Sequence, residues 1–238
     1  MSAYLVGDLH GDFKHFKKLL KKIDFNENSD KIYILGDVLD RGSDGIKMLN
    51  FINHHAKNGS MYLLKGNHEF FAQMYLEGKL SSKQWQKWGG APTLKEISDL
   101  SRDEKAELAA YLRGLPHFLE LSLWGRDCVL THSGLCFDFL VENDDKIDVC
   151  ASIKKALDFD EFEFLCSNDL HYLAKSELKK LDKYLIVGHT PTFKLDENDL
   201  SYIVKNDYYI DLDSGAGYRH KGGKVSALRI DDKKEFYI

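Results

Sequence analysis

The sequence predicts an α/β protein, and three observations lead to this fold class. Short apolar runs rich in β-branched and aromatic residues indicate buried strands. In the first half of the 238-residue chain, these runs alternate with segments whose apolar residues recur at helical spacing. In addition, five of the runs end next to an Asp, Asn or His side chain. Ligands of α/β sheets bind beyond the carboxyl ends of the strands, so this placement also fits the class.

The first half of the chain contains a predicted βαβαβ unit. Strands are predicted at residues 3–7, 31–36 and 60–65, with helices at 12–22 and 44–57. The first helix has apolar residues on one face and lysines on the other, which is typical of a helix that covers a sheet. Because βαβ units almost always form right-handed crossovers between parallel strands, the three strands are expected to lie side by side in one sheet.

The middle of the chain is predicted to be a helical insertion around residues 68–114. Ser81 and Ser101 each precede a Gln or Glu by three residues, which is the capping-box pattern that opens a helix. The second of these helices is predicted to end at Gly114, just before Pro116. A turn over residues 88–93 is expected to separate the two helices.

Strands return in the second half of the chain. A helical stretch is predicted at residues 160–182, and the acidic, weakly periodic segment 138–160 is predicted to be a mobile surface excursion. The predicted strands cover residues 116–123, 127–131, 184–188, 201–204, 208–212, 224–230 and 235–237. Because the polar residues at strand ends extend from residue 8 to residue 189, residues 1–238 are predicted to form a single domain.

The composition is that of an ordinary globular protein. Hydrophobic residues make up 43% and charged residues 30%, and the net charge of −5 gives no general attraction to nucleic acid or acidic membranes. No apolar stretch approaches the ~20 residues that span a bilayer. A strand begins almost at the first residue and leaves no room for a signal peptide, so the expected location is the cytoplasm. Four cysteines are predicted to be reduced thiols: Cys128, Cys136, Cys150 and Cys166.

The polar side chains at the strand ends predict a site for two divalent metal ions. Asp8 and His10 lie on the same side of an extended segment and could share one ion. Asp37 has two carboxylate oxygens and could bridge both ions. The second ion would be completed by Asn67, His132 and His189. This mixed N/O donor set suits Mn²⁺, Fe, Zn²⁺ or Co²⁺. Two such ions ~3.5–4 Å apart can hold a bridging hydroxide for in-line attack on a phosphoryl group.

A phosphate substrate is predicted from Arg41, which follows Asp37 by four residues. A guanidinium beside two cations would be repelled unless an anion lay between them, and phosphate can accept its bidentate hydrogen bonds. His68 follows the ligand Asn67 and could protonate the leaving-group oxygen. Asp40 could orient this imidazole and raise its basicity. Asn67 is also a candidate substrate-binding residue.

The motifs resemble those of the calcineurin-like metallophosphoesterases, and more narrowly the phosphoprotein phosphatase branch with its bacterial and bacteriophage serine/threonine phosphatases. The similar blocks are Gly7-Asp8-Leu9-His10-Gly11, Gly36-Asp37-Val38-Leu39-Asp40-Arg41-Gly42, Gly66-Asn67-His68-Glu69, Thr131-His132-Ser133-Gly134 and Val187-Gly188-His189-Thr190. The resemblance implies a sandwich of two mixed β-sheets flanked by helices. It also implies the metal, phosphate and acid roles given above, with Mn²⁺ as the expected metal.

One position departs from the family pattern. Relatives that act on phosphoproteins usually carry a second phosphate-binding arginine between the last two histidine blocks. This chain has no arginine between His132 and His189, and Asn168 falls at the expected place. An amide can donate a hydrogen bond but brings no charge. Two consequences are open: phosphate binding in the ground state is weaker, or Arg219, in the C-terminal part of the chain, replaces the missing arginine.

The leading functional hypothesis is a metal-dependent hydrolase of phosphoserine and phosphothreonine in proteins. The alternative is a symmetrical diadenosine tetraphosphate hydrolase or another nucleotide phosphohydrolase with the same metals, because these enzymes share the motif order. A non-enzymatic alternative is a phosphate-binding regulatory protein, which the full set of predicted ligands disfavours. The expected partner is a phosphorylated protein or a small phosphoester, and the expected state is a monomer.

Overall fold

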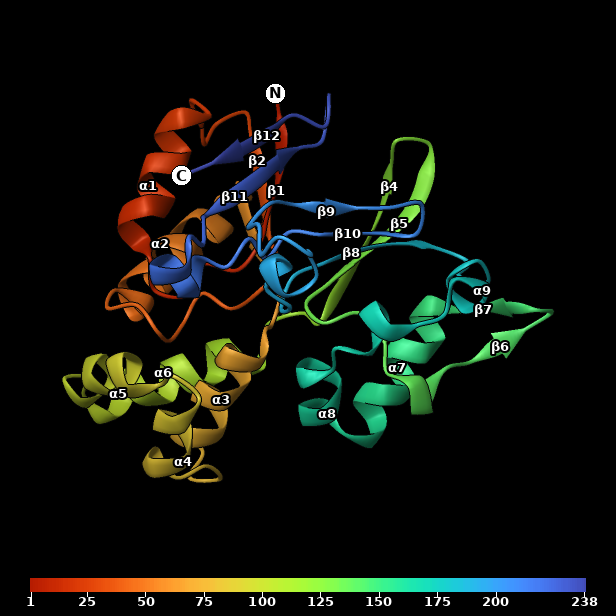
Figure 1. Cartoon of the computed structure of the whole chain (residues 1–238). Coiled ribbons are helices and arrows are strands. Elements are labelled where there is room, and N and C mark those ends of the chain that lie inside the picture. The colour runs from red at the N-terminus through yellow and green to blue at the C-terminus, as the bar shows by residue number, and fades with distance from the viewer.

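All 238 residues are described by the computed structural model, in which two β-sheets lie between layers of helices (Figure 1). The strands are β1 (Ala3–Val6), β2 (Lys31–Ile34), β3 (Met61–Leu63), β4 (Phe118–Leu123), β5 (Arg126–Thr131), β6 (Glu142–Asn143), β7 (Lys146–Ile147), β8 (Tyr184–Val187), β9 (Val204–Lys205), β10 (Tyr209–Asp211), β11 (Ser226–Arg229) and β12 (Glu235–Tyr237). The α-helices are α1 (Phe13–Lys22), α2 (Gly45–Lys57), α3 (Asn67–Leu76), α4 (Ser82–Lys87), α5 (Ala91–Ser98), α6 (Arg102–Arg113), α7 (Val149–Phe159), α8 (Glu161–Cys166) and α9 (Lys175–Leu178).

The strand order confirms the predicted fold class. The first sheet has the order β12-β11-β1-β2-β3, and the second has the order β4-β5-β8-β10-β9. Strands β1, β2 and β3 are parallel, as expected from the βαβαβ unit, whereas β11 pairs with β1 in the antiparallel direction. In the second sheet, β5, β8 and β10 are parallel, and β4 and β9 are antiparallel edge strands. Both sheets are therefore mixed.

The two sheets pack through a compact apolar layer. Side chains on successive residues of a strand point to opposite faces, and β1 shows the result. Leu5 belongs to the cluster that includes residues from both sheets, whereas Tyr4 and Val6 belong to the larger core cluster that also contains helix residues. The layer is formed by Leu5, Leu35, Leu64, Cys128, Leu130, Ile186, Ile203, Ile210, Leu212 and Leu228. This packing holds the carboxyl ends of the parallel strands of both sheets at a fixed separation.

The helical insertion is confirmed, with one difference from its predicted boundaries. Helices α4 and α6 start after Ser81 and Ser101, whose side chains accept backbone hydrogen bonds from Gln84 and Glu104. The predicted turn over residues 88–93 is shorter than expected, because α5 already begins at Ala91. Pro92 lies in the first turn of α5, where its missing N–H would have no partner in any case.

Two predictions for the second half need correction. The segment 138–160 is a surface excursion only in part: residues 142–146 of the β6–β7 hairpin are exposed, but α7 packs into the core, and its residues Val149 and Ile153 are fully buried. The predicted helix 160–182 is broken into α8 and α9. Asp160 has an extended backbone that ends α7, and its carboxylate caps α8 by accepting the backbone N–H groups of Phe162 and Glu163.

Two other expectations can be compared with the structure. All four cysteines are unpaired, as predicted. A helix needs about 20 apolar residues to cross a bilayer, and no helix of this structure has the length and apolar character for that.

Candidate metal centre

The predicted strand ends of both sheets meet at one place. Asp8, Asp37 and Asn67 follow β1, β2 and β3 of the first sheet, and His132 and His189 follow β5 and β8 of the second. Backbone hydrogen bonds hold these loops together. The N–H of His10 donates to the carbonyl of Asp37 at 2.8 Å, and the N–H of Gly188 donates to the carbonyl of His132 at 2.9 Å.

Asp37 lies between two groups of metal-binding atoms. Its Oδ2 is 3.6 Å from Nε2 of His10, and its Oδ1 is 3.4 Å from Nε2 of His132. On the first side, Oδ2 of Asp8 lies 3.8 Å from Nε2 of His10. On the second side, Nδ1 of His189 lies 3.2 Å from Nε2 of His132. The carboxylate of Asp37 can therefore contact an ion on each side, as the sequence predicts.

Asn67 joins the second group through its side-chain oxygen. This Oδ1 atom is 2.9 Å from Nε2 of His132 and 3.0 Å from Nδ1 of His189. Asn67 is the first residue of α3, so the helix fixes its position at the site. The oxygen and the two imidazole nitrogens converge on one point, which is the arrangement that a single cation requires.

The ring orientation of three histidines is set by backbone carbonyls. Nδ1 of His10 lies 3.1 Å from the carbonyl of Leu39, and Nδ1 of His132 lies 2.8 Å from that of Leu35. Nε2 of His189 lies 3.3 Å from the carbonyl of Cys166. A carbonyl only accepts, so each of these nitrogens carries the proton. The other nitrogen of each ring then presents a lone pair to the site, as in metal-ligating histidines.

Electrostatics also favours a cation. Burial lowers the pKa of His10, His132 and His189, in the last case to about 3, so these imidazoles are neutral near pH 7. Burial raises the pKa of Asp8 well above its usual value, and the carboxylates of Asp213 and Asp37 raise it further. Oδ2 of Asp8 is buried without a hydrogen-bond partner. Neutral imidazoles and a crowded carboxylate with one oxygen lacking a hydrogen-bond partner fit divalent cations of the Mn²⁺, Fe, Zn²⁺ and Co²⁺ class.

Metal removal is expected to destabilise the protein, because the buried carboxylates of Asp8 and Asp37 would then repel each other. When the ion concentration is about 100 times Kd and the ion binds only the folded state, binding raises the free energy of unfolding by about 2.7 kcal/mol. For a chain of this size that corresponds to an increase in Tm of about 5–10 °C. Differential scanning fluorimetry of chelator-treated protein, with and without added Mn²⁺, measures the shift.

The variant Asp8→Asn tests whether the stabilisation by metal depends on Asp8. It removes one of the repelling carboxylates, so the metal-free variant is expected to be more stable than the metal-free wild type and to gain less from Mn²⁺. Asp158→Asn, which changes an exposed carboxylate on α7, is the matched control and should keep the full shift. An equal Mn²⁺ response in wild type and Asp8→Asn would contradict the assignment of Asp8.

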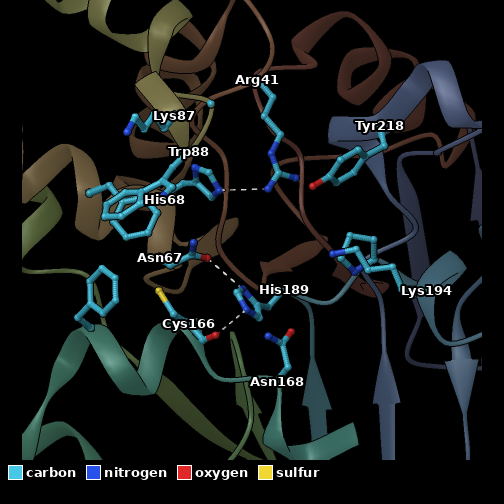
Figure 2. Close-up of a pocket in the computed structure, with 14 residues that line it drawn as sticks. Arg41, Asn67, His68, Lys87, Trp88, Cys166, Asn168, His189, Lys194 and Tyr218 are labelled. Atoms are coloured by element: carbon cyan, nitrogen blue, oxygen red, sulfur yellow. Dashed lines mark hydrogen bonds between the residues drawn. The ribbon is translucent and has the colours of Figure 1, made fainter. Parts of the chain in front are cut away.

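On the pocket side of the ligands, Arg41 and His68 lie next to each other, and Figure 2 shows the contact. Nη1 of Arg41 is 2.9 Å from Nε2 of His10, and Nη2 is 3.3 Å from Nε2 of His68. The guanidinium also stacks on Tyr218, with its carbon 4.6 Å from the ring centroid. The structure therefore places the predicted phosphate-binding arginine and the predicted acid at one edge of the metal site.

The predicted His68–Asp40 pair is present as a buried hydrogen bond. Nδ1 of His68 is 2.6 Å from Oδ2 of Asp40, which is fully buried. Two further residues, which the sequence analysis did not single out, hold this carboxylate. The indole N–H of Trp85 donates to Oδ2 at 2.7 Å, and the hydroxyl of Thr93 donates to Oδ1 at 2.5 Å. Both come from the helical insertion, so α4 and α5 orient the pair from a distance in sequence.

His68 differs from the other site histidines in its protonation. Burial disfavours its charged form, but Asp37 and the hydrogen-bonded Asp40 outweigh burial and raise the pKa of His68 above its ordinary value. A protonated imidazole can donate from Nε2 toward the pocket while its Nδ1 stays bonded to Asp40. This is the state that a proton donor needs.

Glu69 is a third residue near the site whose role is not apparent from the sequence. Its buried carboxylate accepts four backbone N–H groups: Oε2 bonds Asp37 and Gly66, and Oε1 bonds Val38 and Leu39, at 2.7–3.1 Å. Glu69 thereby holds the loop that carries Asp37 and Asp40. Its signal in the sequence is its position as the third residue of α3 after Gly66, where a glutamate commonly accepts from the helix N-terminus.

The backbone around the site is strained. Five of the predicted site residues have left-handed φ values, which side-chain-bearing residues rarely adopt: His10 (44°), Asp37 (50°), Asp40 (68°), Arg41 (65°) and His189 (70°). Such strain persists only where the surrounding structure enforces it, and it concentrates at functional sites. The hydrogen bonds of Glu69 supply part of that enforcement.

The glycines that precede the ligands allow close approach. A Cβ atom on Gly66 would lie 2.3 Å from Oδ1 of Asp37, and one on Gly188 would lie 2.3 Å from Oδ1 of Asp8. Any larger residue at either place would push a carboxylate out of the site. This steric requirement explains why several of the apolar runs end in glycine.

A pocket of about 610 Å³ opens in front of the candidate metal site, as Figure 2 shows. It is lined by Arg41, Asn67, His68, Phe71, Lys87, Trp88, Gly89, Phe162, Cys166, Asn168, His189, Pro191, Lys194 and Tyr218. The lining includes three of the residues predicted to act on the phosphate, Arg41, Asn67 and His68, but no carboxylate side chain. An anionic substrate with an organic part fits this composition.

The structure does not place Arg219 in the pocket. Nη1 of Arg219 instead donates to the carbonyls of Gly223 and Ile238, at 2.9 and 2.7 Å, and the side chain lies near Asp12. The expectation that it replaces the missing arginine is therefore wrong. Asn168 does line the pocket, and its Oδ1 accepts a hydrogen bond from the hydroxyl of Thr190 at 2.6 Å, which leaves its amide hydrogens for other partners.

Comparison with known proteins matches residues 1–212 to the family model of calcineurin-like phosphoesterases. Similar curated proteins are named symmetrical bis(5'-nucleosyl)-tetraphosphatases. One from Nitrosospira multiformis is 29% identical over 166 residues, which are 70% of this chain and 54% of that protein. One from Haemophilus ducreyi is 32% identical over 135 residues, which are 57% of this chain and 46% of that protein. The chain thus spans about half the length of the curated relatives it matches.

Solved structures show the same fold at low sequence identity. A candidate diadenosine tetraphosphatase has a TM-score of 0.65 and 17% identity, covering 100% of this chain and 92% of its own. A serine/threonine phosphatase from Saccharomyces cerevisiae has a TM-score of 0.63 and 16% identity, covering 100% of this chain and 79% of its own. At these identities, the likeness establishes the fold alone.

The names of the curated relatives contradict the leading functional hypothesis from the sequence. None of the curated relatives described above is named as a phosphatase of phosphoserine or phosphothreonine in proteins. Their shared name agrees instead with the nucleotide alternative. The resemblance at the level of the motifs is confirmed by the family match, the fold and the convergence of the strand ends. This chain belongs to the calcineurin-like phosphoesterase family.

Proposed function

We propose that this protein is a metal-dependent phosphohydrolase of dinucleoside polyphosphates that cleaves diadenosine tetraphosphate symmetrically. The supporting observation is the combination of curated relatives with that name and a pocket lined by basic and aromatic residues without a carboxylate. In this reaction, water attacks one of the two central phosphorus atoms and the bond to the bridging oxygen breaks. The products are two molecules of ADP.

Two divalent cations, with Mn²⁺ as the proposed metal, would be held by the residues identified above. Asp8, His10 and Asp37 would hold the first, and Asp37, Asn67, His132 and His189 the second. When bound, the ions supply positive charge against the phosphoryl oxygens and lower the pKa of water. The histidines contribute neutral nitrogen donors whose orientation is already set by backbone carbonyls.

Arg41 is proposed to bind the phosphoryl group that is attacked. Its Nη1 lies 2.9 Å from Nε2 of His10, and a metal ion would use the lone pair of that nitrogen. A guanidinium and a cation cannot share that lone pair, so metal binding would free Arg41 to donate to phosphoryl oxygens. Asn67 borders the same pocket and is proposed as a further substrate contact. Tyr218 stacks on the guanidinium and limits its movement.

His68 is proposed to donate a proton to the departing oxygen. Its Nε2 faces the pocket beside Arg41, and Asp40 holds Nδ1 through a 2.6 Å hydrogen bond. Trp85 and Thr93 fix the carboxylate of Asp40, so the imidazole cannot rotate freely. Because the ligands come from both halves of the chain and the core cluster extends from Tyr4 to Phe236, we further propose that residues 1–238 act as one domain.

His68→Asn is expected to lower kcat most for substrates with poor leaving groups. Loss of a general acid typically costs 10²–10⁴-fold in rate, and we expect about 10³-fold for β-glycerophosphate, whose alkoxide must be protonated. The loss should be at least about tenfold smaller for p-nitrophenyl phosphate, because its leaving group departs readily without a proton. Steady-state kinetics of the Mn²⁺-loaded protein on both compounds measures the difference.

His54→Asn is the matched control, because His54 is exposed on α2 and does not line the pocket. It is expected to change neither rate. Equal losses on both substrates in His68→Asn would argue against proton donation and would leave His68 with a purely structural role.

Product analysis tests the proposed function directly. The Mn²⁺-loaded protein would be incubated with diadenosine tetraphosphate, and the nucleotides would be separated by anion-exchange chromatography. We expect ADP as the nucleotide product. Equal amounts of AMP and ATP would show asymmetric cleavage, and an unconsumed dinucleotide in the presence of p-nitrophenyl phosphate turnover would overturn the proposed substrate class while retaining a phosphohydrolase.

A further inference from the structure

Three aromatic rings form a continuous surface on one side of the pocket. The rings of Phe71 and Trp88 are 4.5 Å apart between centroids, and Phe162 lies 5.8 Å from each of them. They come from α3, from the turn after α4 and from α8, which are separate parts of the chain. We call Phe71, Trp88 and Phe162 the aromatic surface. Figure 2 shows Trp88 beside His68, on the side of the pocket opposite Tyr218.

The aromatic surface is open toward the pocket. Within it, Phe71 is buried, whereas Phe162 is 40% exposed and Trp88 is partly exposed. Trp85 and Trp124, the other tryptophans of the chain, donate their indole N–H groups to Asp40 and to the carbonyl of Ile230. The indole N–H of Trp88 has no such partner within the protein. A partly exposed ring with an unused donor at the edge of a pocket is suited to contact a ligand.

Basic side chains border the pocket on both sides of the candidate metal centre. Lys87 precedes Trp88 on the side of the aromatic surface, and Lys194 lies on the opposite side with Tyr218, as Figure 2 shows. Neither lysine forms an ion pair with a carboxylate, although the chain carries 38 acidic residues. The positive charge of the pocket therefore extends beyond Arg41. Basic side chains on opposite sides of one pocket suit a chain of several phosphates.

We propose that the aromatic surface stacks one nucleobase of the substrate, while Lys87 and Lys194 bind the polyphosphate on either side of the scissile bond. This inference rests on the proposed function and specifies how the pocket selects a nucleotide over a simple phosphoester. Stacking on aromatic side chains tolerates any base because every base has a π face. The lysines provide charge without fixed geometry, which suits a flexible chain of phosphates.

Binding measurements test the base site without relying on turnover. Isothermal titration calorimetry of the Mn²⁺-loaded protein would use two probes: ADP, which has a base, and methylenediphosphonate, which has a diphosphate-like charge but no base and cannot be hydrolysed. The wild type is expected to bind ADP more tightly. Phe162→Leu should reduce this preference about tenfold, the effect of losing a base–aromatic stacking contact. Trp88→Leu is expected to act in the same direction.

Phe159→Leu is the matched control. Phe159 is 75% exposed at the end of α7 and lies outside the pocket lining, so its replacement should leave the preference for ADP unchanged. Phe162 is 40% exposed and leucine keeps an apolar side chain there, so Phe162→Leu is not expected to impair folding, and thermal denaturation verifies this.

The two proposals fail in different ways. If the wild type cleaves diadenosine tetraphosphate to ADP but Phe162→Leu and Trp88→Leu keep the full preference for ADP over methylenediphosphonate, the base site is overturned and the proposed function stands. If the dinucleotide is not cleaved although the aromatic variants lose the preference for ADP, the base site is supported and the proposed reaction is overturned.

Discussion

Replacing Asp37 by asparagine is expected to abolish hydrolysis and to remove bound metal. Each oxygen of Asp37 faces a different group of donors, with His10 on one side and His132 on the other. The backbone N–H of His68 donates to Oδ1 of Asp37 at 3.0 Å. Asparagine has only one side-chain oxygen, and this hydrogen bond favours placing it at the Oδ1 position, on the side of His132. The amide hydrogens would then face His10 and a cation could not bind there. Metal content by elemental analysis and turnover of diadenosine tetraphosphate measure the two losses.

The control for this variant is Asp158→Asn, which has the same change in charge at an exposed position of α7. It is expected to retain both metal and activity. Full metal occupancy together with normal kcat in Asp37→Asn would rule out a bridging role, and the two donor groups would then have to act independently.

Glu69→Gln is expected to be the most destabilising conservative change near the site. Each carboxylate oxygen accepts two backbone N–H groups, from Asp37 and Gly66 and from Val38 and Leu39. Glutamine keeps one acceptor oxygen and turns an NH₂ group toward the other pair, which leaves two buried donors without acceptors. Each unsatisfied buried donor costs about 1–3 kcal/mol, so two of them are expected to lower the unfolding free energy by about 2–6 kcal/mol. Urea denaturation of the metal-free proteins measures this loss.

Glu104→Gln is the matched control for this prediction. Glu104 has the same position in α6 that Glu69 has in α3, and its carboxylate accepts the N–H of Ser101, but it is exposed. Its replacement should change stability by no more than about 0.5 kcal/mol. Glu69→Gln should also lower kcat about 10–100-fold, the usual effect of losing a group that orients metal ligands. Unchanged stability in Glu69→Gln would mean that the loop holds its strained backbone without the carboxylate.

The parts of the site that could be predicted are those with a local cause. Asp8, Asp37 and His132 each lie within three residues of the end of an apolar strand, so the strand prediction also placed the residue at a sheet edge. The parallel order of β1, β2 and β3 followed from the short βαβ connections. In these cases, sequence neighbours decide the geometry, and one chain is enough to infer it.

Features that depend on distant residues could not be predicted. Trp85 and Thr93 donate hydrogen bonds to Asp40, from which they are separated by more than 40 residues in the sequence. Nothing in their local sequence marks them as its partners. Helix α7 has a weak local pattern and is stabilised by burial of Val149 and Ile153. The break at Asp160 arises because its side chain caps α8 in competition with continuation of α7.

The substrate prediction failed for a related reason. The block that contains Asp40 and Arg41 describes how a phosphoryl group is bound, and this requirement is common to phosphoprotein and nucleotide substrates. The features that can separate them are the rings of Phe71 and Phe162 and the charge of Lys194, which lie at distant sequence positions and meet only in the folded pocket. The absence of an arginine between His132 and His189 was the one linear signal that pointed away from a phosphoprotein substrate.

The pairing of β1 with β11 has a consequence for synthesis of the protein. Strand β1 carries the segment that leads to Asp8 and His10, and it lies between β2 and β11. Strand β11 begins at Ser226, so at 5–20 residues per second the ribosome makes it on the order of tens of seconds after β1. During that interval β1 is an unpaired apolar edge, which nascent-chain chaperones would have to shield. A nascent chain arrested before residue 226 should therefore be captured by such chaperones and lack a metal site, even though every ligand has been translated.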